Sequence, residues 1–395
     1  MSFIRNSEQN FAFHNAGSVL HGVEHEDINA APSTLGLDFK LAGFSSAHSF
    51  DFTFSPSSLP PKRVAVMIGK NGVGKSRALN ELVSSAISGA RNFHDGLGKM
   101  PRLSRILALC TPGEAEHTFP AEPSIVSNFR YKRISSNASS GEQSLPSILV
   151  NLSRDRRKIG GRWRWDIFEE SIRQIVEFSD LVLAARDDAL VRDRLVDIER
   201  LWLFGEQASA EARQKVSLTG QLMRRVDGGA VSLSSGQLSF IRLAVQLCTF
   251  IENGSLVLMD EPETHLHPNL ITGLVAMLDR ILRLTGSIAI AATHSAYLVR
   301  EVPQSQVHII RQPEASGPVE ILKPRLRTFG ADVGAISHFV FGDDIVNRLI
   351  EELEPKIQGD TAAAEQWLAS VESELSTEAF MLLTREIEKR RGAAQ

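Results

Sequence analysis

Residues 69–76 (GKNGVGKS) have the spacing Gly, four residues, Gly-Lys-Ser. The glycines let successive backbone N–H groups curl around a phosphate, and a helix that begins beside them favours an anion. In this pattern Lys75 reaches the β- and γ-phosphates, and the Ser76 hydroxyl coordinates Mg²⁺. A buried apolar strand at 64–68 precedes the turn, which is the context that this chemistry requires. The predicted phosphate-site residues are Gly69, Asn71, Gly72, Gly74, Lys75, Ser76 and Arg77.

A second apolar run, residues 256–259, ends in the carboxylates Asp260 and Glu261. At the tip of a strand, Asp260 is placed to hold Mg²⁺ directly or through water. Glu261, one residue further, is placed to orient and deprotonate an attacking water. An acidic strand end before a turn at Pro262 is common in any protein. The phosphate pattern elsewhere in the chain favours the metal interpretation.

Two further segments predict contacts with phosphate. Ser234, Gly236 and Gln237 stand at the start of an amphipathic helix, where a hydroxyl caps free N–H groups and those same groups offer a second anion site. His294 follows the strand at 288–292, at the carboxyl end where ligands of parallel sheets collect. A local hydrogen bond would explain a lone histidine; beside the other motifs we expect a γ-phosphate contact. Glu261 and His294 are therefore the predicted catalytic residues.

The elements that must position these residues alternate between short strands and helices. This alternation predicts an α/β fold with a parallel sheet. A helical pattern occupies 75–88, another runs from 165 to about 215, and the tail from 332 onward is helical and acidic. The predicted strands cover residues 35–41, 50–54, 64–68, 105–110, 256–259, 288–292 and 307–310.

Composition narrows the class of protein. The 395 residues carry a formal net charge of −4, so binding of nucleic acid through bulk charge is not expected. The segment from Ala331 onward holds 13 acidic and 6 basic residues, and the rest is slightly basic. Two cysteines cannot make a disulfide framework, and the sequence contains neither a long apolar run nor a secretory leader. We expect a cytoplasmic protein without a membrane segment.

The order GKNGVGKS, LSSGQ, LVLMDEPETHLHP and AATHS resembles an ABC-type ATPase head, the class that includes SMC-like repair proteins. The phrase DEPETHLHP is similar to OLD-like AAA ATPases, many of them in bacterial anti-phage systems such as the Septu ATPase. The resemblance covers roughly 35–325 and implies a P-loop NTPase fold with ATP and Mg²⁺ as cofactors. It divides the chain into an ATPase domain at 1–330, with a helical insertion at 146–230, and an acidic helical C-terminal cap at 331–395.

The resemblance also implies an assembly. In this class ATP lies between the Lys75 loop of one subunit and the Ser234–Gly236 loop of another. Because the chain has one copy of each, a head-to-tail homodimer around two ATP molecules is expected. The family usually has a glutamine that senses Mg²⁺; its position here is open, and Gln143 is a candidate. The aromatic residue that stacks on adenine is open among Phe44, Phe50 and Phe52.

Several other signals have competing interpretations. A run of cations and tryptophans fits either a nucleic-acid surface or a solvated helix start with packed rings; it comprises Arg154, Arg156, Arg157, Lys158, Arg162, Trp163, Arg164 and Trp165. His265 and His267 alternate near carboxylates, but His267-Pro268 fits a helix start better than a metal site. OLD nucleases add a Toprim domain; Asp343-Asp344 alone does not make such a site, so no intrinsic nuclease is expected.

These observations lead to an ordered set of functional hypotheses. The first is a Mg²⁺-dependent ATPase that controls an effector protein on a separate chain, a nuclease or toxin, in anti-phage defence. The alternatives are a DNA-repair ATPase of the RecF or SMC type, a transporter's nucleotide-binding subunit, which the histidine phrase and the acidic cap disfavour, and a scaffold that binds ATP with little turnover.

Overall fold

The computed structural model describes residues 32–110, 118–123, 130–135, 144–186, 194–202, 205–312, 318–341 and 361–388, with gaps of one or two residues inside some of these ranges. The chain divides into two compact units, Met1–Ile336 and Ser337–Gln395. No helix in the described part is long and apolar enough to cross a membrane.

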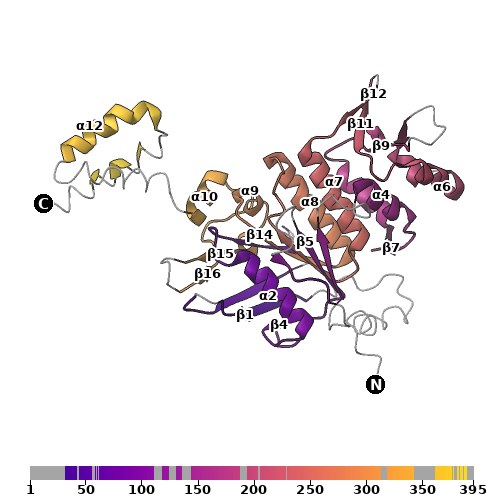
Figure 1. The fold of residues 1–395 in the computed structure, drawn as a ribbon. Helices are drawn as coiled ribbons and strands as arrows, with labels where there is room; N and C mark the ends of the chain where they lie inside the picture. Colours follow the sequence, from indigo (N-terminus) through magenta and orange to yellow (C-terminus); the bar gives the residue numbers. More distant parts are fainter. Residues whose placement is uncertain are drawn as a thin grey trace. The chain divides into compact units, whose positions relative to one another are not determined.

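A seven-stranded sheet with the order β16-β15-β3-β14-β13-β5-β6 forms the centre of the first unit (Figure 1). Its neighbouring strands are parallel except β15 and β16. The predicted α/β fold is confirmed. The strands are β3 (Val64–Ile68), β5 (Arg105–Cys110), β6 (Arg130–Ser135), β13 (Ser255–Asp260), β14 (Ile288–Thr293), β15 (Val307–Arg311) and β16 (Glu320–Leu322).

Two layers cover this sheet. Helix α2 (Lys75–Ser88) packs on β13 and β14. The hydrophobic core beneath it also includes residues of a small antiparallel sheet of order β2-β1-β4. The strands of that sheet are β1 (Thr34–Phe39), β2 (His48–Thr53) and β4 (Phe93–Asp95). In Figure 1, α7 (Ser235–Phe250) and α8 (Pro268–Thr285) lie on the side of the central sheet opposite α2. The short α9 (Ala296–Val299) packs on α8.

The region 146–230, expected to be a helical insertion, is mixed rather than helical throughout. Its helices are α4 (Leu145–Arg154), α5 (Arg164–Ile172) and α6 (Gly205–Lys215). It also contains a four-stranded antiparallel sheet of order β10-β9-β11-β12 and the short hairpin β7–β8. These strands are β7 (Lys158–Ile159), β8 (Arg162–Trp163), β9 (Leu181–Ala184), β10 (Leu195–Asp197), β11 (Leu222–Val226) and β12 (Gly229–Ser232).

The strand β9 explains the difference. Its sequence LVLA is a short apolar run that is buried along most of its length. Such a run fits a buried strand as well as a helix segment, because it has no polar face to give it a period. Pairing with β10 and β11 decides the outcome, and those partners lie in other segments of the chain.

The second unit is helical where it is described, with α12 (Thr361–Val371) as its longest element. A small apolar cluster of Ala364, Leu368, Leu383 and Ile387 holds it together. Helix α10 (Val333–Phe341) spans the division between the units. Asp343 and Asp344 lie outside the described residues.

Candidate nucleotide-binding and hydrolysis site

The phosphate loop follows β3 and ends at the first residue of α2. Gly72 has φ +83° and Gly74 has φ +100°, backbone conformations that favour glycine. A Cβ at Gly69 would lie 2.4 Å from the Ile310 carbonyl oxygen, so a larger residue would push β15 away. Gly74 caps α2 without a side-chain hydrogen bond, so the helix start faces the loop with backbone groups alone. This is the local structure that the glycine pattern predicts.

Lys75 lies inside the loop and is only 7% exposed. Its ammonium group donates to the carbonyl oxygens of Gly69 at 2.8 Å and Lys70 at 3.1 Å. Burial lowers the pKa of Lys75, and the carboxylates of Glu261, Asp260 and Glu263 oppose that shift. Lys75 therefore stands within the electrostatic reach of the acidic end of β13.

The other predicted phosphate-site residues differ in how far their side chains are exposed to solvent. Ser76 is half-buried in the first turn of α2, whereas Asn71 and Arg77 are exposed at the surface. Ser76 is thus the second residue of the helix that Lys75 begins. The roles of these residues toward a nucleotide stay predictions.

Asp260 ends β13 and is 3% exposed. The Thr118 hydroxyl donates to its carboxylate at 2.8 Å. The Asn80 side chain on α2 in turn donates to the Thr118 carbonyl oxygen at 2.9 Å. A chain of contacts thus connects the phosphate-loop helix to the carboxylate that is predicted to hold Mg²⁺.

Glu261 and His294 are brought together from adjacent strand ends. The Glu261 carboxylate forms an ion pair with Nδ1 of His294, whose side chain is 60% exposed. The Glu261 backbone N–H donates to the Ala292 carbonyl oxygen at 2.9 Å, which ties the end of β13 to β14. Glu261 also has φ +48°, a conformation that costs free energy for a residue other than glycine. The loop therefore holds its backbone in place while the side chain faces His294.

Glu263 completes an acidic cluster with Asp260 and Glu261, and it was not among the predicted site residues. It is 8% exposed and accepts a hydrogen bond from the Thr293 hydroxyl. Burial raises the pKa of Glu263 to about 7. Its position two residues after Glu261 in the DEPE phrase was the available signal. Thr118 offered no comparable signal, because its partner Asp260 is far away in the sequence.

Ser234 and Gln237 form a reciprocal capping box at the start of α7: the Ser234 hydroxyl accepts from the Gln237 N–H at 3.2 Å, and the Gln237 side chain accepts from the Ser234 N–H at 3.1 Å. A Cβ at Gly236 would lie 3.3 Å from the His265 carbonyl oxygen and 3.0 Å from the Leu270 side chain.

Helix α7 packs on α4, α5 and α8, whereas α2 packs on β13, β14 and β4. The contacts described for Ser234, Gly236 and Gln237 thus join them to one another and to the loop after Glu261, rather than to Lys75.

The aromatic candidates for stacking on adenine separate by burial. Phe50 and Phe52 are each 1% exposed in the core. Phe44 is half-buried, and its ring meets the His48 ring edge-on at 5.1 Å. A Cβ at Gly74 would lie 3.4 Å from Nε2 of His48, so this segment lies beside the phosphate loop. Phe44 is the candidate with an accessible ring. Gln143 lies outside the described residues.

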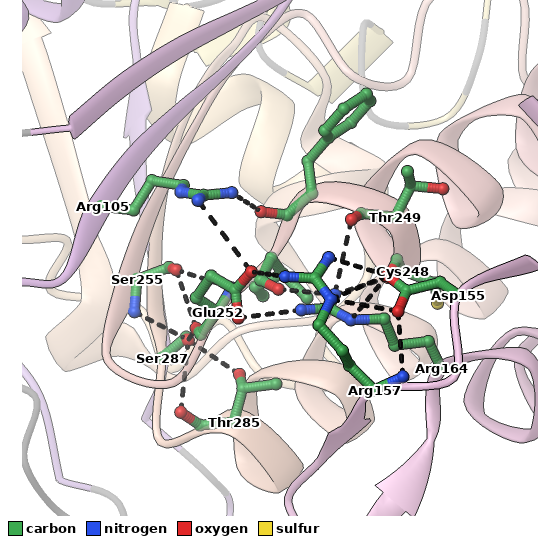
Figure 2. A network of polar contacts seen from close by, with 12 residues as sticks. Arg105, Asp155, Arg157, Arg164, Cys248, Thr249, Glu252, Ser255, Thr285 and Ser287 are labelled. Carbon is green, nitrogen blue, oxygen red and sulfur yellow. Dashed lines mark hydrogen bonds and ion pairs between the residues drawn. The ribbon is translucent and has the colours of Figure 1, made fainter. Parts of the chain in front are cut away.

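Most of the basic and aromatic run has structural partners. Arg164 is 1% exposed, and its guanidinium donates to the carbonyl oxygens of Cys248 and Ile251 and pairs with Glu252 at 2.8 Å. Figure 2 shows how Arg157 joins the same network through Asp155 and Glu252.

Most of the remaining members of the run also have partners, whereas Arg154 is exposed. Arg162 pairs with Glu170, and Trp165 is fully buried. The cations of Arg156 and Lys158 lie over the rings of Trp202 and Trp163, at 4.0 and 4.7 Å from their centroids. These contacts favour the packed-ring interpretation over a nucleic-acid surface. His267 caps α8, as the His-Pro step predicted.

Part of the chain matches a known protein family, and most of it aligns with a phage protein. Residues 119–300 match the family described as "AAA domain, putative AbiEii toxin, Type IV TA system". Protein ea59 of Escherichia phage lambda is 25% identical over 344 residues, which cover 84% of this chain and 64% of ea59. The chain thus spans slightly less than two thirds of that relative.

Similar solved structures include the SMC head domain from Thermotoga maritima, with a TM-score of 0.35 and 12% identity, covering 74% of this chain and 99% of that one. UvrA2 from Deinococcus radiodurans has a TM-score of 0.39 and 15% identity, covering 82% of this chain and 42% of that one. The family match and the parallel sheet with its phosphate loop confirm the resemblance drawn from the four motifs: the chain is similar to ABC-type, SMC-like AAA ATPases.

Proposed function

We propose that this protein hydrolyses ATP with Mg²⁺, that two copies close head-to-tail around the nucleotide, and that the conformational change controls a partner protein. The observation that carries the proposal is the convergence of Lys75, Asp260, Glu261 and His294 at the carboxyl edge of one sheet. Strands β3, β14 and β13 are parallel neighbours in that order, and each leads at its carboxyl end into a segment that holds one of these residues.

The residues fit a nucleotide with its metal. Lys75 donates to loop carbonyl oxygens that phosphate oxygens can replace, and the helix start beside it favours an anion. The Ser76 hydroxyl and the Asp260 carboxylate are oxygen ligands of the kind that Mg²⁺ prefers. When bound, Mg²⁺ neutralises charge on the β- and γ-phosphates.

The side chains of this chain then have distinct tasks. Glu261 is placed to take a proton from a water, and His294 holds its carboxylate and is exposed enough to contact the γ-phosphate. Thr118 orients Asp260, and Phe44 supplies an accessible ring for the base.

We infer a second subunit because the start of α7 and the phosphate loop, which this class of site combines, lie on helices with different packing partners. Ser234 and Gly236 begin α7, whose packing partners are α4, α5 and α8 rather than the phosphate-loop helix. With one copy of each motif in the chain, a site that uses both requires another copy. Closure on binding and release on hydrolysis would supply two states to a partner.

We infer the biological setting from the description of the matching family and from the source of the relative ea59. The description of the matching family names an AbiEii toxin and a type IV TA system, and ea59 belongs to a phage. These names support a role in conflict between bacteria and phages. The effector in this proposal is a nuclease or toxin on a separate chain in the cytoplasm. A DNA-repair ATPase and an ATP-binding scaffold with little turnover remain the competing functions.

Glu261→Gln tests the hydrolysis mechanism. We expect ATP turnover to fall by about 100-fold or more, since a positioned base contributes on that order. The affinity for ATP should be retained, and light scattering with Mg-ATP should show a dimer. Glu320→Gln, on the exposed edge strand β16, is the matched control and should keep turnover. Unchanged turnover in Glu261→Gln would remove the base from its role, and a monomer would contradict the two-headed assembly.

The partner can be sought with the same variant. Tagged Glu261→Gln protein is recovered from its host with ATP present, and co-purifying chains are identified by mass spectrometry, with Lys75→Ala as the control that lacks the nucleotide. A nuclease or toxin enriched only with Glu261→Gln supports effector control. Salt-sensitive, ATP-dependent recovery of DNA with repair proteins would favour the repair function instead.

A further inference from the structure

Three side chains at the edge of the sheet gather their ligand atoms in one place. Glu261, Glu263 and His294 each offer one oxygen or nitrogen atom, and these atoms lie within 4.8 Å of one another. The two glutamates come from the turn after β13, and the histidine follows β14. Since the strands are paired in parallel, the two segments meet side by side.

One oxygen of the Glu263 carboxylate is buried and unsatisfied among the described residues. Its side chain is buried, and one carboxylate oxygen accepts the Thr293 hydroxyl. The other oxygen, Oε2, is buried without a hydrogen-bond partner among the described residues. Glu261 adds a second carboxylate nearby. A charged carboxylate is costly to bury, and a cation between the two carboxylates would add to the positive charge that Lys75 supplies nearby.

We propose that Glu261, Glu263 and His294 form a binding site for one divalent first-row transition-metal ion, such as Mn²⁺ or Zn²⁺, separate from the Mg²⁺ position at Ser76 and Asp260. One imidazole with two carboxylates is a donor set that these ions accept, whereas Mg²⁺ prefers oxygen ligands alone. The His294 side chain is 60% exposed, so a metal ion can reach its imidazole from solvent.

A metal ion in this site would affect the proposed ATPase activity, and this part of the inference rests on that proposed function. Coordination occupies the Glu261 carboxylate and the His294 imidazole, so neither is available to a water or a phosphate. A bound transition metal would therefore inhibit hydrolysis while leaving Lys75 and Ser76 able to hold nucleotide. The cluster would make turnover sensitive to the supply of such metals.

The direct test uses Mn²⁺ and the full chain without nucleotide or Mg²⁺. Electron paramagnetic resonance measures the free ion, and we expect one Mn²⁺ bound per chain. Pulsed measurements should show coupling to an imidazole nitrogen. Glu263→Gln, which can still accept the Thr293 hydrogen bond, should weaken binding about tenfold or more, the order of loss seen when metal sites are perturbed. His294→Ala should remove the nitrogen coupling.

Two controls separate this site from the nucleotide's metal. Ser76→Ala should bind Mn²⁺ as the wild type does, and so should Glu320→Gln. Loss of binding in Ser76→Ala but not in Glu263→Gln or His294→Ala would place the ion in the phosphate loop and overturn the proposal. Absence of bound Mn²⁺, or binding without nitrogen coupling, would overturn it too.

Because no nucleotide is present, the result is independent of whether the chain hydrolyses ATP. Thermal unfolding of each variant checks its fold, and His294→Ala alters an exposed side chain, so it provides a readout even where Glu263→Gln is unstable.

Discussion

The Thr118 hydroxyl donates a hydrogen bond of 2.8 Å to the carboxylate of Asp260, although 142 residues separate the two in the sequence. Thr118 is itself held from α2, because the Asn80 side chain donates to its carbonyl oxygen. The helix that begins at the phosphate loop and the strand that ends in the carboxylate predicted to hold Mg²⁺ are therefore joined through one buried residue, Thr118. We infer that Thr118 orients Asp260 toward Mg²⁺.

Thr118→Val keeps the shape of the side chain and removes this hydrogen bond. A single hydrogen bond to a charged group contributes about 1.5–3 kcal/mol, so we expect the Mg²⁺ concentration for half-maximal ATPase activity to rise about tenfold or more. The measurement is a Mg²⁺ titration of ATP turnover at saturating ATP. Thr118→Ser keeps the hydroxyl and should restore most of the affinity. An unchanged Mg²⁺ requirement in Thr118→Val would contradict the orienting role.

Phe44→Ala tests the site of the adenine base. Stacking of a base on an aromatic ring is worth about 1–3 kcal/mol, so the dissociation constant for ATP should rise at least about fivefold. The measurement is fluorescence titration with a labelled ATP analogue. Phe50→Leu, in the buried core, should instead lower the melting temperature and leave the affinity nearly unchanged. Equal affinity in Phe44→Ala and the wild type would show that the base lies elsewhere.

The sequence predicted the features that depend on local pattern. The phosphate loop, the carboxylates at the end of β13 and the histidine after β14 are each specified by a few neighbouring residues, and the strands that carry them are buried on both faces. Because these strands are parallel neighbours, placing each motif at a strand end was enough to bring the motifs together. The pairing of Glu261 with His294 follows from that placement.

Other features depend on contacts between distant segments. Thr118 carries no motif, and its role is visible only once the chain has folded against Asp260. The apolar run of β9 became a strand because β10 and β11 pair with it. Arg164 and the cations near it could serve a surface or a core, and only the fold shows that Arg164 is buried against the end of α7 while Arg156 and Lys158 lie over tryptophan rings. Single-sequence patterns do not contain these tertiary choices.

His308 predicts how stability depends on pH. It is 2% exposed on β15, and burial, with the nearby Lys323 ammonium, lowers its pKa to about 4. Its Nε2 lies 2.9 Å from the Asp51 carbonyl oxygen and 2.6 Å from Nζ of Lys323. In the unfolded chain the imidazole takes up its proton near pH 6.5, so between pH 6.5 and 4 the unfolded state binds more protons. The free energy of unfolding should therefore fall as pH decreases through this window.

His308→Gln removes the titration and retains a donor for the Asp51 carbonyl oxygen. We expect the wild type to lose about 2 kcal/mol from this group between pH 7 and pH 5, and the variant to lack that part of the pH dependence. Urea denaturation at both pH values measures it. The comparison uses the difference between the two pH values for each protein, since the substitution also changes packing. Parallel pH dependences in the two proteins would exclude His308 as the source.

Mixing two inactive variants tests whether each hydrolysis site uses two subunits. Lys75→Ala removes the lysine that is predicted to contact the phosphates of ATP. Gly236→Trp places a large side chain where even a Cβ already meets Leu270 and the His265 carbonyl oxygen. In a head-to-tail dimer of one subunit of each kind, both defects fall in the same site. The other site combines an intact Lys75 loop with an intact start of α7.

The mixture should therefore regain ATP turnover that neither variant has alone. Random pairing makes half of the dimers mixed, each with one intact site of two, so we expect about a quarter of wild-type turnover if the sites act independently. Each variant alone, at the same total concentration, is the control, and thermal unfolding checks that Gly236→Trp folds. Turnover no higher than that of the separate variants, with mixed dimers verified by mass spectrometry, would mean that one subunit's residues suffice or that the sites fire only together. Recovery near a quarter would show that Gly236 of one copy serves Lys75 of the other.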